Sequence, residues 1–270
     1  MAFENIYGQA QAVRVLQSAI ASERVPGAYL FVGPPGVGKN FTAMQFAKAL
    51  NCEGEGDDAC DSCPNCRLIN REEFPDLFVP VQRDRRIIKG STATDRGKGY
   101  LIDIVSRLHF PPVMGRFKVV LLDPADRLTE EAGNMLLKIL EEPPRKTLFI
   151  LVTTLEDSVL ATLVSRCQRL RFPPLPVDTV RQFLVDRGEN PALAAAVSKA
   201  SRGSIEHALE LGQTRLMEQK LEVVDFLLNL FSSPLHDRVE SSVRLLGTPA
   251  PPDPPAGSPP PPLPLSLSLP

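Results

Sequence analysis

The amino-acid sequence predicts an α/β fold, in which a parallel, doubly wound sheet is followed by smaller helical domains. A glycine-rich loop, residues 33–40, separates a short apolar run from a helical segment, as in a strand, a phosphate-binding loop and a helix. Apolar strands then alternate with helical segments as far as residue 172. Beyond Pro173-Pro174 the pattern turns all-helical, so we expect a domain boundary there.

The order of these segments predicts a sheet with crossover helices. Apolar runs predict strands at 28–32, 75–79, 117–123, 147–153 and 168–172. Helices are predicted at 9–20, 41–50, 102–108, from Thr129 to the stop at 141–144, and from Asp157 to about 165. Gln9, Val13, Leu16 and Ile20 recur at helical spacing in the first of them. In such a sheet ligands bind at the carboxyl ends of the strands.

Composition limits the class of protein. The 270 residues include 30 basic and 32 acidic side chains, for a net charge of −2, so bulk charge does not indicate nucleic-acid binding. No long apolar run and no signal-peptide pattern occur, which predicts a soluble, cytoplasmic protein with no membrane partner. Five cysteines in such a protein favour a metal site or free thiols over disulfides.

The phosphate-binding loop departs from its usual pattern at one position. Its members are Gly33, Pro34, Pro35, Gly36, Val37, Gly38, Lys39 and Asn40. The glycines let backbone N–H groups face phosphate oxygens, and the lysine adds a positive charge. Position 40 normally carries Ser or Thr, whose hydroxyl ligates Mg²⁺, so Asn40 predicts a nucleotide fold with weakened ATP and Mg²⁺ binding.

Asp123 is the second nucleotide element, because a carboxylate at the end of a buried strand normally holds magnesium in such proteins. Its alternative is an aspartate that merely caps a turn. In hydrolytic ATPases a glutamate often follows and polarises the attacking water, but Pro124 cannot act as a base. Asp126 would have to point the wrong way to replace it.

Four cysteines in the segment 51–70 predict a structural zinc site: Cys52, Cys60, Cys63 and Cys66. A redox pair or an iron–sulfur cluster is the alternative, although no thioredoxin-like unit surrounds the motif. The segment is small, acidic and cysteine-rich, so we expect a loop insertion outside the core. Cys167 stands apart and is interpreted as a buried small hydrophobe.

The remaining segments are basic or helical. Residues 83–98 are strongly basic and are interpreted as a solvated loop rather than a functional patch. Helices at 178–187, 191–201 and 203–211 predict a small helical domain over 173–212. Two further amphipathic helices, at 214–231 and 235–246, predict part of another domain over 213–247. The tail, 248–270, is proline-rich and is expected to be disordered.

Together these residues resemble the AAA+ subunits of the bacterial DNA polymerase III clamp loader, of the delta-prime type or its gamma/tau relatives. The resemblance covers residues 1 to about 212. It rests on 33–39, the four-cysteine insert, 74–77, 119–126, 136–144, Thr153-Thr154 and 165–168. It implies an AAA+ P-loop domain over 1–172, a helical lid over 173–212 and a truncated helical collar over 213–247.

The resemblance also implies roles for single residues. Arg166 becomes a trans-acting arginine finger, although its placement alone suggests a solvated side chain. Thr153 or Thr154 becomes the sensor near the γ-phosphate, and Gly203-Ser204 begins the second sensor helix. An active gamma/tau-type ATPase would carry Thr, Glu and Arg where this chain has Asn40, Pro124 and Glu206.

That pattern favours a delta-prime-like stator, which donates a finger and has little or no ATPase activity of its own. Implied partners are the gamma/tau and delta types of subunit and, indirectly, the sliding clamp and primer-template DNA in replication by the polymerase holoenzyme. Two alternatives stay open: an active gamma/tau-type motor, and a zinc-dependent nucleic-acid-binding module that uses residues 83–98. The short collar leaves open whether the chain assembles stably.

Overall fold

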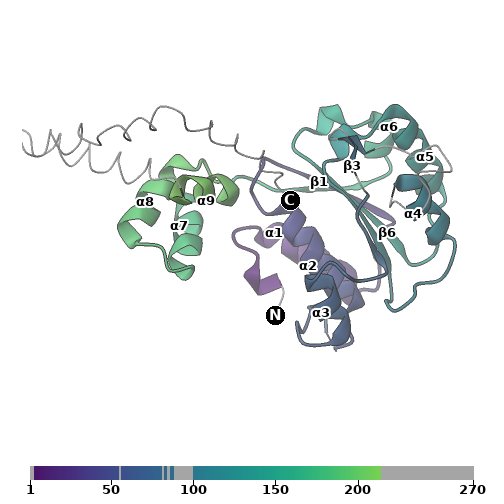
Figure 1. The fold of residues 1–270 in the computed structure, drawn as a ribbon, viewed down its shortest axis with the longest axis horizontal. Helices are drawn as coiled ribbons and strands as arrows, with labels where there is room; N and C mark the ends of the chain where they lie inside the picture. Colours follow the sequence, from purple (N-terminus) through teal and green to yellow (C-terminus); the bar gives the residue numbers. More distant parts are fainter. Residues whose placement is uncertain (1–2, 55, 81, 84–85, 88–99, 214–270) are drawn as a thin grey trace, which may run out of the picture. The chain divides into compact units, whose positions relative to one another are not determined.

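The computed structural model describes residues 3–54, 56–80, 82–83, 86–87 and 100–213 (Figure 1). All of them fall within one compact unit, Met1–Thr214. The predicted collar helices, the proline-rich tail and most of the basic segment 83–98 lie outside the described residues. No helix in the described part of the chain is long and apolar enough to cross a membrane.

A five-stranded parallel sheet forms the centre of this unit, as predicted. Its strands are β1 (Ala28–Val32), β2 (Leu77–Phe78), β5 (Lys118–Leu122), β6 (Thr147–Thr153) and β7 (Gln168–Arg171). They lie in the order β2-β5-β6-β1-β7, and every neighbouring pair is parallel. Since β1 lies between β6 and β7, the loop that follows it opens beside the carboxyl ends of two other strands. A separate hairpin joins β3 (Gln82–Arg83) and β4 (Arg86–Ile87).

Helices cover both faces of the sheet (Figure 1). Side chains alternate along β1, so that Tyr29 and Phe31 face one hydrophobic cluster while Leu30 faces another. The first cluster includes side chains from α1 (Ala10–Ala21), α2 (Lys39–Asn51) and α3 (Pro64–Asn70). The second includes side chains from α4 (Leu101–Leu108), α5 (Glu130–Glu141) and α6 (Ala161–Val164). The three-layer arrangement of an α/β fold follows.

Helix termini follow the predicted signals in one case and depart from them in another. Thr129 caps α5 through its side chain, which accepts a hydrogen bond from the Ala132 N–H at 3.4 Å. The prediction that Asp157 caps the next helix is wrong. Asp157 lies inside a 3₁₀ turn, Glu156–Ser158, and α6 begins after Leu160 without a side-chain cap. Two more 3₁₀ turns lie at Phe3–Asn5 and Ala125–Arg127.

The prediction that residues 51–70 lie outside the core is also wrong. The segment contains α3, and the side chains of Cys52, Ala59 and Cys66 are part of the first hydrophobic cluster. The composition of the segment suggests a loop because it is rich in small and acidic residues and in cysteine. Thiols, however, pack as small apolar groups, so the cysteines bring the segment into the core.

Within the described residues, three helices follow β7, as predicted: α7 (Val177–Asp186), α8 (Pro191–Ala200) and α9 (Ile205–Gln213). Asn190 caps α8 through its side chain, which accepts from the Ala192 N–H at 2.9 Å. The buried side chains of Val180, Leu184 and Val197 give α7 and α8 an apolar face. The division of this unit into domains at residue 172 stays a prediction.

Candidate functional site

The phosphate loop connects β1 to α2 and packs against the start of α9. Gly36 has a φ of +70°, and a Cβ there would lie 2.1 Å from Ser204 Oγ, so both backbone and space require glycine. The carbonyl oxygen of Gly36 accepts a hydrogen bond from the Ile205 N–H at 2.8 Å. The loop therefore contacts the helix that the sequence predicts as the second sensor.

Lys39 is 6% exposed and turns back onto its own loop. Its ammonium group donates to the carbonyl oxygens of Gly33 at 2.7 Å and Pro34 at 2.6 Å. Burial lowers the pKa of Lys39, while the carboxylates of Asp123, Glu206 and Asp126 act in the opposite direction. The lysine is thus positioned inside the loop and surrounded by acidic groups.

Asn40 and Asp123 meet at the carboxyl edge of the sheet, where the sequence places both of them. The side-chain amide of Asn40 donates to Asp123 Oδ2 at 2.7 Å. Pro124 follows Asp123, and the peptide bond between them is cis. The structure therefore brings the two predicted magnesium positions together, in direct contact with each other.

Thr153 and Asp126 form a second polar pair at this edge. The Thr153 hydroxyl lies within donating distance of two acceptors, Asp126 Oδ1 at 3.1 Å and the Leu155 carbonyl oxygen at 2.9 Å, and it accepts from the Leu155 N–H at 3.1 Å. Thr154, the other predicted sensor, is exposed. Asp126 thus faces the predicted sensor threonine, a contact that sequence reasoning missed because nothing in the local pattern fixes the direction of a 3₁₀-turn side chain.

Gln9, the first residue of the predicted helical stripe, holds two distant segments together through its side-chain amide. Its side chain is 2% exposed and donates to the carbonyl oxygens of Val37 at 3.2 Å and Pro173 at 3.0 Å. It therefore joins the phosphate loop to the segment that leads into α7. A polar residue at an apolar position of the stripe is the signal that could have identified it.

Arg166 lies in the turn between α6 and β7, away from the phosphate loop in sequence and on the surface. Its guanidinium donates to Glu141 Oε1 at 2.6 Å and to the Thr162 carbonyl oxygen at 2.9 Å. The side chain is 34% exposed and that of Glu141 is 54% exposed. The ion pair holds the arginine in place while leaving it within reach of solvent.

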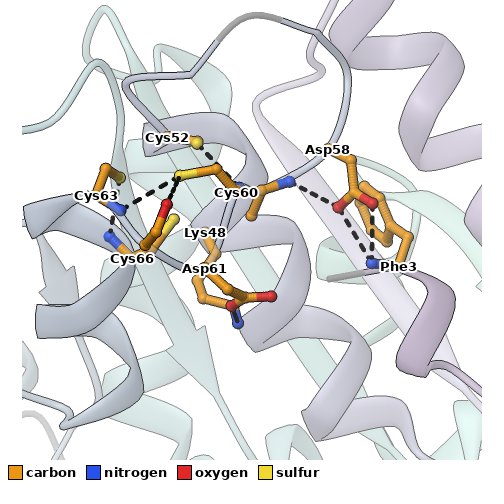
Figure 2. Close-up of polar contacts among 10 residues, drawn as sticks. Phe3, Lys48, Cys52, Asp58, Cys60, Asp61, Cys63 and Cys66 are labelled. Atoms are coloured by element: carbon orange, nitrogen blue, oxygen red, sulfur yellow. Dashed lines mark hydrogen bonds and ion pairs between the residues drawn. The ribbon is translucent and has the colours of Figure 1, made fainter. Parts of the chain in front are cut away.

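The four predicted cysteines converge on one point (Figure 2). Their sulfur atoms all lie within 4.8 Å of one another, close to the separation of about 3.8 Å that tetrahedral zinc–thiolate geometry requires. Backbone N–H groups of Cys60, Cys63 and Cys66 donate to neighbouring cysteine sulfurs at 3.3–3.4 Å. Such bonds stabilise thiolates, which are the form that binds metal.

The protonation of these thiols follows their surroundings. A hydrogen bond from Ser62 is the main cause that lowers the pKa of Cys60 to about 6, with backbone N–H groups assisting. Burial is the main cause that raises the pKa values of Cys52 and Cys66. Four sulfur donors and no His or carboxylate fit zinc in a closed structural site. Cys167 is separate from the cluster, and burial raises the pKa of its thiol to about 11.

Several polar contacts attach the cysteine cluster to the sheet domain (Figure 2). Asp61 forms an ion pair with Lys48 of α2, whose side chain is 5% exposed. Both carboxylate oxygens of Asp58 accept from the Phe3 N–H, at 3.1 and 3.3 Å. Arg116 donates to the Cys52 carbonyl oxygen at 2.7 Å. The cluster is therefore an integral part of the domain.

The sheet order, the phosphate loop and the helices after β7 define the chain as an AAA+ P-loop protein. Its fold is similar to that of a DNA polymerase III gamma subunit-related protein from Thermotoga maritima, with a TM-score of 0.51 and 18% identity, over 87% of this chain and 71% of that one. The model of the family described as "DNA polymerase III, delta subunit" matches residues 8–176, and the chain belongs to that family.

Several sequence relatives carry related names. The chain is 32% identical to the DNA polymerase III subunit tau of Bacillus subtilis, over 75% of this chain and 36% of that protein. It is 30% identical to the subunit delta′ of the same organism, over 80% of this chain and 63% of that protein. The tau subunit of Escherichia coli is 32% identical over 77% of this chain and 32% of its own length. The chain thus spans about a third of these tau subunits.

Proposed function

We propose that this chain is a delta-prime-like subunit of a bacterial DNA polymerase III clamp loader. In this role it acts in the cytoplasm as a stator that presents Arg166 to ATP bound by a neighbouring gamma/tau-type subunit, while the complex loads the sliding clamp onto primer-template DNA. The observation that carries the proposal is a contrast: Arg166 is ordered and accessible, whereas the chain's own phosphate site has Asn40 paired with Asp123.

The position of Arg166 suits an arginine that acts on another subunit. A guanidinium is planar and always charged, and it binds phosphate oxygens through two parallel N–H groups. Glu141 and the Thr162 carbonyl fix its direction, and their exposed setting keeps the cost of exchanging Glu141 for a phosphate low. The arginine would stabilise the charge that develops during phosphoryl transfer.

The chain's own site supports little or no ATP hydrolysis. Pro124 provides no carboxylate to orient a water molecule, and Glu206, at the start of α9, brings negative charge toward Lys39. If ATP and Mg²⁺ bind, residues 33–40, Asp123 and Thr153 or Thr154 would surround the phosphates. The phosphate loop and Lys39 would then supply binding and orientation.

The decisive experiment replaces Arg166 in a complex reconstituted from this chain, gamma/tau-type and delta-type subunits. We expect Arg166→Ala to lower clamp- and DNA-stimulated ATP turnover by about 10-fold or more, because an arginine finger contributes at least that much to phosphoryl transfer. Arg169→Ala is the matched control, since Arg169 is a nearby exposed arginine that pairs with Glu156 at 2.9 Å. Equal turnover by the Arg166 and Arg169 variants, in complexes of equal composition, would contradict the finger role.

A second candidate is an active gamma/tau-type motor, which the 32% identity to tau subunits favours. ATP turnover by the isolated chain separates the two candidates. A rate of about 0.1 per second or more would support the motor, because such a value lies within about tenfold of the typical range for enzymes. Turnover that stays at the background of the Lys39→Ala variant would support the stator.

A further inference from the structure

The contact between Asn40 and Asp123 has a specific chemical meaning. In phosphate-loop proteins the Ser or Thr hydroxyl after the lysine and the strand-end aspartate hold a magnesium ion between them. Here the longer side chain of Asn40 reaches Asp123 directly, with its Nδ2 2.7 Å from Oδ2. An amide N–H group donates a hydrogen bond and cannot ligate a cation. The direct bond therefore occupies an Asp123 oxygen that a bridging metal would use.

Other polar side chains beside Asn40 and Asp123 are also paired with protein groups. The Thr153 hydroxyl lies 3.1 Å from Asp126 Oδ1, so each of the two carboxylates at this edge of the sheet has a protein donor within hydrogen-bond distance. The ammonium group of Lys39 is held by two carbonyl oxygens of its own loop. Magnesium demands near-octahedral oxygen coordination and gives up its water reluctantly, so it competes poorly for ligands that are already paired.

We propose that Asn40 excludes the divalent cation from this phosphate loop by forming the hydrogen bond to Asp123. Any nucleotide that binds here does so with an affinity that does not depend on magnesium, and a hydroxyl side chain at position 40 restores that dependence. The inference deepens the proposed function, on which it rests for the assignment of residues 33–40 as a phosphate site. The disagreement between these residues and Mg²⁺ is local and does not involve Arg166.

The test is a titration of the isolated full chain with a fluorescent ATP analogue, followed by anisotropy, in excess EDTA and in excess Mg²⁺. For the wild-type chain we expect the affinities in the two conditions to agree within about twofold, or binding to be undetectable in both. For Asn40→Thr we expect an affinity about tenfold or more higher in Mg²⁺ than in EDTA. Asn40→Ser provides a second variant with the same hydroxyl, and Asn134→Thr, an exposed position on α5, is the matched control.

Two results would overturn the proposal. One is a wild-type affinity that rises about tenfold or more when Mg²⁺ replaces EDTA. The other is an absence of magnesium dependence in both hydroxyl variants, with circular dichroism showing that they are folded. Because the readout is the affinity of the isolated chain, failure here is distinct from failure of the Arg166 experiment, which measures turnover by the assembled complex.

Discussion

Tyr29 illustrates how a single buried group affects stability. Its ring packs on Phe46 in the first cluster, but within the described residues its hydroxyl has no hydrogen-bond partner. An unpaired buried hydroxyl costs roughly 1–3 kcal/mol. We therefore expect Tyr29→Phe to leave the free energy of unfolding unchanged or to raise it by about 1 kcal/mol, as measured by urea denaturation. A loss of more than about 1 kcal/mol would show that the hydroxyl is paired.

The same residue predicts a pH dependence. Burial raises the pKa of Tyr29 from 10.0 to about 12, so the unfolded chain releases this proton at lower pH than the folded one does. The free energy of unfolding is therefore independent of Tyr29 ionisation below pH 10, and it falls as the pH rises from 10 toward 12. The difference in stability between wild type and Tyr29→Phe should therefore change across that window, with the variant losing less stability.

Local pattern predicted some site residues and not others. Lys39, Asn40 and Asp123 could be placed because each follows a strand of a parallel sheet, where geometry is fixed by neighbours in sequence. The roles of Gln9 and Asp126 could not, because their partners are distant in the chain: Gln9 contacts Pro173, and Asp126 contacts Thr153. Such contacts depend on how the elements pack, which periodicity does not encode.

Among the elements, the cysteine cluster and α3 are those that a bound metal would stabilise most directly. We expect a strong zinc chelator to lower the thermal midpoint of the chain, and Cys66→Ser to lower it by about 10 °C, since metal binding supplies folding free energy at such sites. Cys167→Ala is the control, because Cys167 lies outside the cluster. Zinc content is measured by atomic absorption. Purified protein that contains no zinc, and whose thermal midpoint does not change with the chelator, would contradict the assignment.

The loop 109–116, which precedes β5, depends on one buried carboxylate. Asp76 is fully buried, and its oxygens accept from the N–H groups of Val113, Met114 and Gly115 at 2.7–2.8 Å. Asp76→Ala would leave these three donors without their acceptor, so we expect the free energy of unfolding to fall by about 3 kcal/mol. Urea denaturation measures it, with the exposed Asp157→Ala as the control. Equal stabilities of the two variants would mean that water replaces the carboxylate.

At the level of the whole described unit, Gln9 joins the phosphate loop to the segment that leads into α7. Its side chain donates to the carbonyl oxygens of Val37 and Pro173. We expect Gln9→Ala to speed amide hydrogen exchange near Ile205 by about fivefold, because a lost hydrogen bond of roughly 1 kcal/mol lowers the free energy of local opening. Gln182→Ala, which removes a surface contact with Asp186, is the control. Unchanged exchange near Ile205 would show that Gln9 does not hold α9.

Fold class was predictable from sequence at this scale, because alternating strands and helices allow few arrangements of a parallel sheet. The contact between Gly36 and Ile205 was not, since it joins residues far apart in the chain. The basic segment and the residues after 213 stay at the level of prediction. The family assignment adds what a single sequence lacks, because a match over residues 8–176 spans the sheet and the cysteine cluster together.

Helix α2 has a mechanical consequence. It starts at Lys39 in the phosphate loop and ends at Asn51, one residue before the first cysteine of the cluster. Its 13 residues form a rod about 20 Å long, and a helix resists compression along its axis. The phosphate loop and the cysteine cluster therefore lie at the two ends of one helix, so α2 fixes the spacing between the candidate nucleotide site and the candidate metal site.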